Sequence, residues 1–177
     1  MKSDKNSQFE IRNSRFGFTM IELLVVIFIM TLLTSLVTTN FQRQRQQQEI
    51  QASSSDLISK IREIQSNLLG GKVVPAAGKA AEAYQIVFTP GSTAFRVDYN
   101  AGGATTTLET VSLPTPNVVI DQIVPGSANP IYLRAPFGKI TAGGVANLTI
   151  QIDLKHSKSG NVRSVIIDGV SGKIGLQ

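Results

Sequence analysis

One acidic residue, Glu22, stands at the edge of a long apolar run, where a charged side chain is costly. After Phe18-Thr19-Met20-Ile21-Glu22 the chain continues for 20 residues, Leu23 to Gln42, without a charged side chain. An unpaired carboxylate at the edge of a membrane-spanning segment costs about 2–3 kcal/mol, so such residues usually have a partner and a function. The sequence therefore predicts a specific partner for Glu22.

The remaining residues do not form a catalytic set. His156 is the only histidine, which excludes a site with several histidine ligands. It lies in Lys155–Asn161, which we interpret as a solvated hairpin turn. Serines and aspartates occur, but nothing groups them into a nucleophile with its base. Gly102-Gly103 and Gly143-Gly144 lack the following Gly-Lys-Ser/Thr of a phosphate-binding loop. We expect a protein that is not an enzyme.

No metal or cofactor site is expected either. The chain has no cysteine, so a cysteine metal site and a disulfide framework are excluded. Asp98, Asn100, Asp121 and Asp153 are calcium-type ligands, but they lack the spacing of a calcium loop. We interpret them as scattered surface residues.

A basic group near the carboxyl end suggests a possible nucleic-acid contact. It comprises Lys155, Lys158, Arg163 and Lys173, which a loop and the final strands would bring to one face. No aromatic residue lies among them to stack on bases, and the formal net charge of the chain is only +5. The alternative is a solvated rim of lysines.

Residues 18–42 are expected to form the membrane-spanning half of a helix. Twenty residues at about 1.5 Å each cover roughly the 30 Å hydrocarbon core. Four Lys or Arg residues precede the run and only Arg43 and Arg45 follow it closely, which predicts a cytoplasmic amino terminus. A secretory signal peptide or an unprocessed single-span anchor are the alternatives. Glu22, the length of the run and the lack of an A-x-A-like site argue against the signal peptide.

These residues resemble the precursors of type IV pilins and type II secretion pseudopilins. The resemblance rests on a basic leader that ends in Gly17, then Phe18-Thr19-Met20-Ile21-Glu22, then the apolar run. It implies that a prepilin peptidase/methyltransferase removes residues 1–17 and methylates Phe18. It also implies that Glu22 aligns an incoming subunit by meeting the amino terminus of a neighbour in the filament. The alternative is that Glu22 snorkels toward the lipid headgroups.

The helix is expected to continue beyond the membrane as an amphipathic half over residues 43–69. The glutamine-rich tract Gln42–Glu49 favours a helical neck, with a solvated linker as the alternative. Beyond it, apolar residues recur at spacings that place them along one helical stripe. They are Ile50, Leu57, Ile58, Ile61, Ile64 and Leu68. Gly70-Gly71 then predicts the end of the helix.

Residues 70–177 are expected to form a β-rich head. Residues 84–88 and 94–99 flank Pro90-Gly91, which is a hairpin signal. Further short strands are expected at 105–111, 118–124, 131–133, 148–154, 162–167 and 173–176. The predicted fold is α+β, type IV pilin-like, with the long helix packed on a mostly antiparallel sheet.

Beyond the membrane segment, the chain resembles the family of GspH/FimT-like minor pseudopilins and minor pilins. The similarity lies in Asp56–Asn67 and in Leu133–Ile140. It also includes three segments near the carboxyl end, namely Leu148–Leu154, Arg163–Ile167 and Ser171–Ile174. It implies a structural subunit with an extracytoplasmic head. Many type IV pilins carry a proline at the position of Thr39, and its absence favours a minor pseudopilin of type II protein secretion. A type IV minor pilin for pilus assembly or DNA uptake is the alternative.

Overall fold

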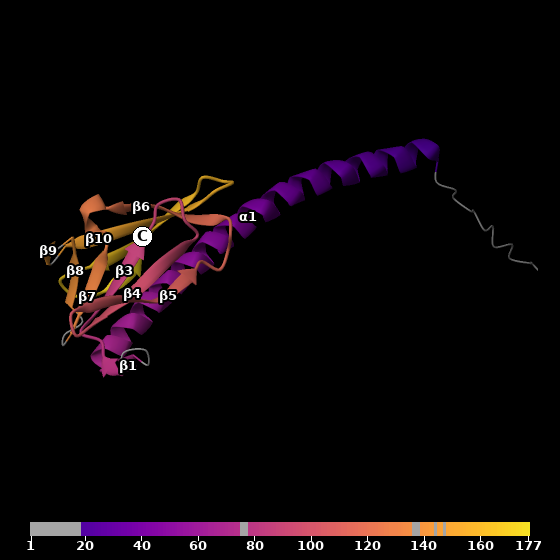
Figure 1. Ribbon diagram of the computed structural model, residues 1–177. Helices are drawn as coiled ribbons and strands as arrows, with labels where there is room; N and C mark the ends of the chain where they lie inside the picture. Colours follow the sequence, from indigo (N-terminus) through magenta and orange to yellow (C-terminus); the bar gives the residue numbers. More distant parts are fainter. Residues whose placement is uncertain (1–18, 75–77, 136–138, 144, 147) are drawn as a thin grey trace, which may run out of the picture. The chain divides into compact units, whose positions relative to one another are not determined.

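The computed structural model describes residues 19–74, 78–135, 139–143, 145–146 and 148–177, and of residues 36–39 and 146 it describes the backbone only. The chain divides into two compact units, Met1–Phe41 and Gln42–Gln177. Among the described residues, the elements are one long helix, one 3₁₀ turn (Gly126–Ala128), and strands that pair only in antiparallel fashion (Figure 1). The fold is α+β and type IV pilin-like, as the sequence predicted.

Helix α1 (Met20–Leu69) begins behind a capping threonine. The Thr19 side-chain oxygen accepts a hydrogen bond from the Glu22 backbone N–H at 3.3 Å. Thr19 and Glu22 have the spacing of a capping box, T-x-x-E, in which the side chain at the cap satisfies a free N–H of the first turn. A carboxylate in the first turn also interacts favourably with the positive end of the helix dipole. The start of α1 is therefore set by local sequence.

In the first unit, α1 exposes its apolar side chains on every side. Every side chain from Met20 to Ser35 is exposed. The hydroxyl groups of Thr31 and Thr34 donate to the carbonyls of Phe28 and Met30 at 2.8 and 2.7 Å, so their polar atoms are satisfied within the helix. Among the described residues, α1 is the one helix long and apolar enough to cross a membrane.

In the second unit, α1 buries the stripe that the sequence predicted. Leu57 and Ile61 are fully buried, and Ile50, Ile58, Ile64 and Leu68 are at most 7% exposed. The helix ends at Gly70-Gly71 as expected. Gly71 has φ +60°, its N–H donates to the Leu68 carbonyl, and the Lys72 N–H donates to the Asn67 carbonyl at 3.0 Å. This pair of bonds is a Schellman motif, which requires a left-handed residue and so favours glycine.

The head contains three antiparallel sheets among its described residues. The six-stranded sheet has the order β5-β4-β3-β7-β8-β9, with β5 (Ala104–Ser112), β4 (Ala94–Ala101), β3 (Ala83–Phe88), β7 (Ile131–Arg134), β8 (Lys139–Ala142) and β9 (Val145–Ala146). The four-stranded sheet has the order β12-β11-β10-β6, with β12 (Ile174–Leu176), β11 (Val162–Asp168), β10 (Thr149–His156) and β6 (Val118–Val124). A short ladder joins β1 (Val73–Val74) to β2 (Lys79–Ala80).

Both larger sheets and the buried stripe of α1 contribute to one hydrophobic core. Along β3, buried and half-buried residues alternate, as expected for a strand with one face on the core. Across the hairpin, the Phe88 and Phe95 rings lie 5.4 Å apart between centroids, within the range of favourable aromatic pairs. The head is therefore held together by apolar packing, without disulfides.

Some details of the head differ from the sequence-based interpretation. Strands β1, β2, β8 and β9 were not predicted, because runs of two to four residues carry too little periodicity. Asp98 and Asp153 are not surface residues, since they are 3% and 4% exposed. Arg96 donates to both carboxylate oxygens of Asp98. Asp153 accepts hydrogen bonds from side chains of Gln122, Gln151 and Ser164 at 2.6–2.8 Å, so its buried charge is satisfied.

We expect Gly143→Ala to destabilise the head strongly. Gly143 has φ +55°, and a Cβ there would overlap the Ser127 backbone carbonyl oxygen. The left-handed conformation costs an alanine about 1 kcal/mol, and the overlap adds about 1–3 kcal/mol. Gly102→Ala is the matched control, because Gly102 has φ +67° but open space around the added carbon. Thermal unfolding of the detergent-solubilised chain measures both, and equal losses of stability would contradict the packing argument.

Candidate functional site

Of the three residues with a predicted role in processing or assembly, the structure describes Glu22. Gly17 and Phe18 lie outside the described residues. Glu22 lies in the first turn of α1, and its side chain is exposed. Within the part of the chain that the structure describes, the Glu22 carboxylate has no hydrogen bond or ion pair. The exposed Glu22 carboxylate is therefore accessible to a group from outside the described part of this subunit.

Thr19 caps the start of α1, a role that was not among the predictions from the sequence. It caps the first turn and orients the backbone of Glu22. The T-x-x-E spacing was a sufficient signal, because it is the sequence signature of a helix start. The cap also provides a simpler role for Glu22, namely support of the first helical turn, which an experiment must separate from pairing with a neighbour.

A second polar site joins α1 to the four-stranded sheet in the head. His156 Nε2 lies 3.1 Å from Glu49 Oε2, and Asn117 donates to the same oxygen at 3.1 Å. Arg45 Nε lies 3.2 Å from Glu49 Oε1. The Ser159 N–H donates to His156 Nδ1 at 3.2 Å, so the hydrogen-bond network assigns the imidazole proton to Nε2 and makes that atom the donor to Glu49. We call Glu49, Asn117 and His156 the neck contact.

The structure corrects our interpretation of His156. The sequence suggested a solvated loop histidine, whereas its side chain is 1% exposed at the end of β10. No local signal distinguishes the two cases, because Glu49 and His156 are 107 residues apart. The role of His156 is to fill a buried position and to hold the β10–β11 turn on the helix.

The neck contact predicts a specific dependence of stability on pH. Hydrogen bonds from Asn117 and then from His156 lower the pKa of Glu49 below its usual value, and the charge of Arg45 adds to this. Because the folded pKa is lowered, the stabilisation is complete above the usual carboxyl pKa and is lost as the pH falls through the folded value. Between about pH 6 and about pH 3, the wild type should therefore lose more stability than Glu49→Gln. Thermal unfolding of both proteins at several pH values measures the difference, and parallel curves would contradict it.

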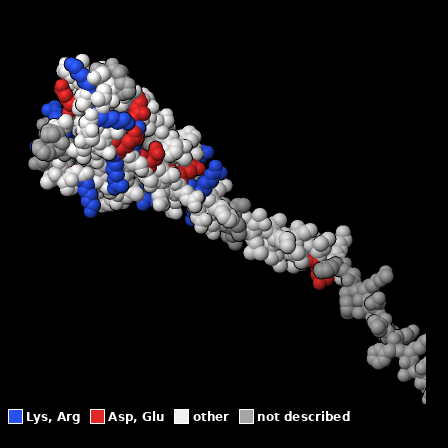
Figure 2. Space-filling view, turned by 90° about the horizontal axis from the view of Figure 1, so that it is seen from below, with Lys and Arg blue, Asp and Glu red and all other residues white. Residues whose placement is uncertain are grey.

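The structure does not bring the four predicted basic residues onto one face. In the antiparallel pair β10–β11, Leu154 lies opposite Arg163 and Lys155 lies opposite Val162, so Lys155 and Arg163 point to opposite faces. Lys155 also lies 3.5 Å from Asp121. On the face seen in Figure 2, basic and acidic side chains are intermixed over the head.

Lys158 and Lys173 lie near different parts of α1. Lys158 lines a hollow with Arg45. The residue before Lys173, Gly172, accepts a hydrogen bond from Gln65. Arg45 and Gln65 are 20 residues apart on α1, which corresponds to about 30 Å along the helix axis. A duplex contact by all four residues would have to reach both of these parts of the helix.

The described residues contain no group of three or more potential metal ligands of the His, Cys, Asp or Glu type. The neck contact holds one histidine and one carboxylate, and both are used in hydrogen bonds to each other and to neighbouring groups. The arrangement is therefore suited to fixing a turn on a helix.

Comparison with protein-family models identifies the prokaryotic N-terminal methylation motif at residues 12–38. The matched segment contains Gly17, Phe18, the capping residue Thr19 and Glu22. No curated protein and no solved structure matches the chain.

Proposed function

We propose that this chain, whose N-terminal methylation motif supports a type IV prepilin-like structural subunit, is a GspH-like minor pseudopilin of a type II secretion filament. The observation that carries the proposal is the methylation motif at residues 12–38, which runs into the capped helix α1. The motif implies processing by a prepilin peptidase and assembly into a filament of pilins.

Processing is proposed to occur between Gly17 and Phe18. This cut removes the basic leader and leaves Phe18 one residue before the helix cap at Thr19. The new, positively charged amino terminus would then lie at the positive end of the α1 dipole. An acidic side chain close to both charges would be favourable there. Mass spectrometry of the membrane-extracted protein tests the cut. An intact amino terminus in cells with an active prepilin peptidase would reject it.

The mature chain is proposed to remain anchored by the apolar half of α1, with the head outside the cytoplasm. The 20 charge-free residues from Leu23 to Gln42, whose side chains are exposed from Leu23 to Ser35, support this placement, since such a surface is stable in lipid and not in water. In the filament, the same apolar surface would pack against the helices of neighbouring subunits. Single-pass topology in the inner membrane is part of the proposal.

Glu22 is proposed to pair with the amino terminus of a neighbouring subunit. The nearest suitable cation in a bundle of parallel, processed helices is the amine at Phe18 of a neighbour, and an unpaired carboxylate there is costly. We expect Glu22→Ala to leave processing intact and to reduce incorporation into filaments by at least about tenfold, which corresponds to about 1.4 kcal/mol. Quantitative immunoblotting of sheared filaments measures incorporation.

Glu22→Gln separates the two roles of this residue. Glutamine also serves at the third position of a capping box, but it carries no charge. If pairing with a neighbour's amine matters, Glu22→Gln should fail as Glu22→Ala does. If only the helix cap matters, Glu22→Gln should assemble like the wild type, and the proposed pairing would be wrong.

The choice between secretion and pilus systems rests on Thr39 and on the cysteine-free head. A type IV minor pilin, with a role in pilus assembly or DNA uptake, would share the processing and the helix. A secretion channel and further pseudopilins encoded nearby would support the proposal, whereas a retraction motor or competence genes would support the minor pilin. The separation of Lys158 from Lys173 along α1 provides no added support for a DNA-binding surface.

A further inference from the structure

Three cations lie where the head begins, directly after the apolar run. Arg43 and Arg45 follow Phe41 by two and four residues. Lys158 belongs to the β10–β11 turn, and it lines a hollow of about 330 Å³ together with Gln42, Arg45, Gln46 and the neck contact. The tertiary fold thus places a lysine from the carboxyl-terminal part of the sequence beside Arg45, and Arg43 lies two residues earlier on α1. We call Arg43, Arg45 and Lys158 the neck cations.

The neck contact fixes Lys158 in this place. His156 is buried and bonds to Glu49 of α1. The Ser159 N–H donates to His156 Nδ1, and the Ser157 N–H donates to the Asn117 carbonyl at 2.8 Å. The residues on both sides of Lys158 are therefore bonded to groups in the neck contact. Lys158 cannot leave the neck without breaking hydrogen bonds of a buried side chain, whose loss is unfavourable.

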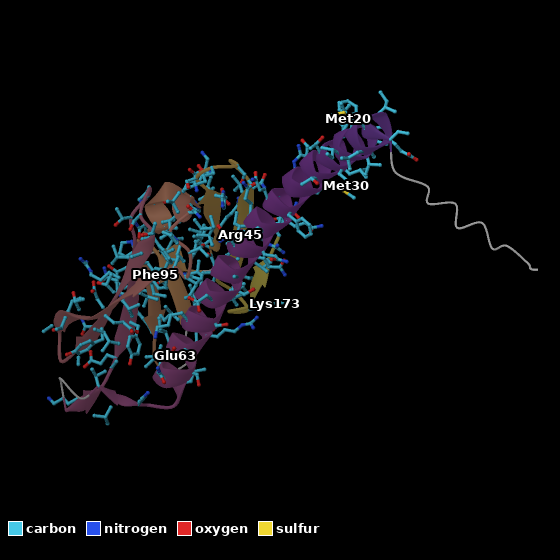
Figure 3. The ribbon with its side chains drawn as sticks, turned by 90° about the vertical axis from the view of Figure 1, so that its right-hand side faces the viewer. Met20, Met30, Arg45, Glu63, Phe95 and Lys173 are labelled. Carbon is cyan, nitrogen blue, oxygen red and sulfur yellow. The ribbon has the colours of Figure 1, made fainter. Side chains whose placement is uncertain are left out.

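The neck cations carry positive charge that the described part of the head does not neutralise. Arg43 and Lys158 have no ion pair among the described residues. Arg45 pairs with Glu49, and the oxygens of Glu49 already accept from Asn117 and His156. Figure 3 shows Arg45 on α1. Two unpaired cations and one partly neutralised cation remain available to an external anion.

The position of Gln42 indicates which anions the neck cations could meet. Gln42 lines the hollow and is bonded covalently to Phe41, the last apolar residue of the run. If the run lies in the bilayer, as the proposed function holds, Gln42 emerges at the lipid headgroups. Arg45 follows within one helical turn, about 5 Å, which is inside the screening length of about 8 Å at physiological ionic strength.

We propose that the neck cations bind the phosphate groups of anionic phospholipids and hold the head of the unassembled subunit on the membrane surface. The partner is an anionic bilayer, and the neck contact acts as the positioning element for Lys158. A cation near an anionic surface contributes about fivefold to binding. For the two unpaired cations, the ratio of docked to undocked heads should rise about 25-fold on an anionic bilayer.

The test uses the full chain in lipid nanodiscs. The chain has no cysteine, so Ser159→Cys provides a single attachment point for a fluorophore beside Lys158. A quencher is attached to the lipid headgroups, in discs of phosphatidylcholine alone and in discs containing phosphatidylglycerol. We expect stronger quenching with phosphatidylglycerol, and we expect added salt to reduce it.

Two triple variants make the result specific. Arg43→Gln, Arg45→Gln and Lys158→Gln together should abolish the dependence on phosphatidylglycerol. Arg134→Gln, Lys139→Gln and Lys173→Gln remove the same charge elsewhere on the head and should preserve it. Equal quenching of the wild type in both lipids, or equal behaviour of the two triple variants, would overturn the proposal. Excess free phosphate should reduce the quenching only by its contribution to ionic strength. A larger reduction would mean that free phosphate competes specifically for the neck cations, and it would overturn the assignment to lipid.

Anchoring is measured separately in the same preparation. If the chain does not co-purify with phosphatidylcholine discs, the membrane anchoring of the proposed function is wrong. If it co-purifies but the label does not respond to phosphatidylglycerol, the anchor stands and only the docking of the head is wrong.

Discussion

Gly17→Val is expected to abolish removal of residues 1–17 while the chain stays in the membrane. A peptidase must place the scissile bond correctly, and a displacement of about 1 Å at the reacting atoms can cost about 10²-fold in rate. Glycine lacks a Cβ and can adopt conformations that a β-branched valine cannot. The apolar residues from Leu23 onward are unchanged, so the anchor should remain. The mass of the membrane-extracted protein should correspond to the full 177-residue chain.

Ser14→Val is the matched control for this variant. It places the same side chain three residues earlier in the leader, away from the proposed cut, and should be processed normally. A Gly17→Val protein that begins at Phe18 would contradict the proposed role of the glycine. Loss of both variants from the membrane fraction would instead locate the defect in insertion.

The double variant Leu57→Ala, Ile61→Ala is expected to unfold the head or leave it close to unfolding. Both side chains are 0% exposed and face the core that the two larger sheets share. Truncation of a buried Leu or Ile to Ala costs about 2–5 kcal/mol each. Since the total stability of a domain is only about 5–15 kcal/mol, the two losses together approach it. The positions are one helical turn apart, so their effects will not simply add.

Thermal unfolding followed by circular dichroism measures this loss in the detergent-solubilised chain. The control is Leu69→Ala on the same helix, because Leu69 is 59% exposed and should cost no more than about 0.5 kcal/mol. A double variant as stable as Leu69→Ala would show that the head does not depend on the helix stripe. Proteolysis of the head in cells should follow the same order of stability.

The sequence by itself determined the helix and most of the strands, because these depend on local patterns. The T-x-x-E spacing, the apolar run, the stripe from Ile50 to Leu68 and the Gly70-Gly71 stop all act over one or a few turns. The strand β6 has the predicted bounds, and Pro90-Gly91 separates β3 from β4 as expected. The methylation motif matches residues 12–38, so it could be recognised from one continuous stretch.

Only the tertiary structure decided which distant residues meet. The sequence indicated a solvated His156 and left open whether the four basic residues share a face or form a solvated rim. The fold instead buries His156 against Glu49, and it places Lys158 at the neck and Lys173 beside Gln65. Such contacts join residues about 100 positions apart, and local propensity contains no information about them. The pairing register of β10 with β11 and the packing of the sheets on α1 determine them, because one residue of register reverses the face of every side chain.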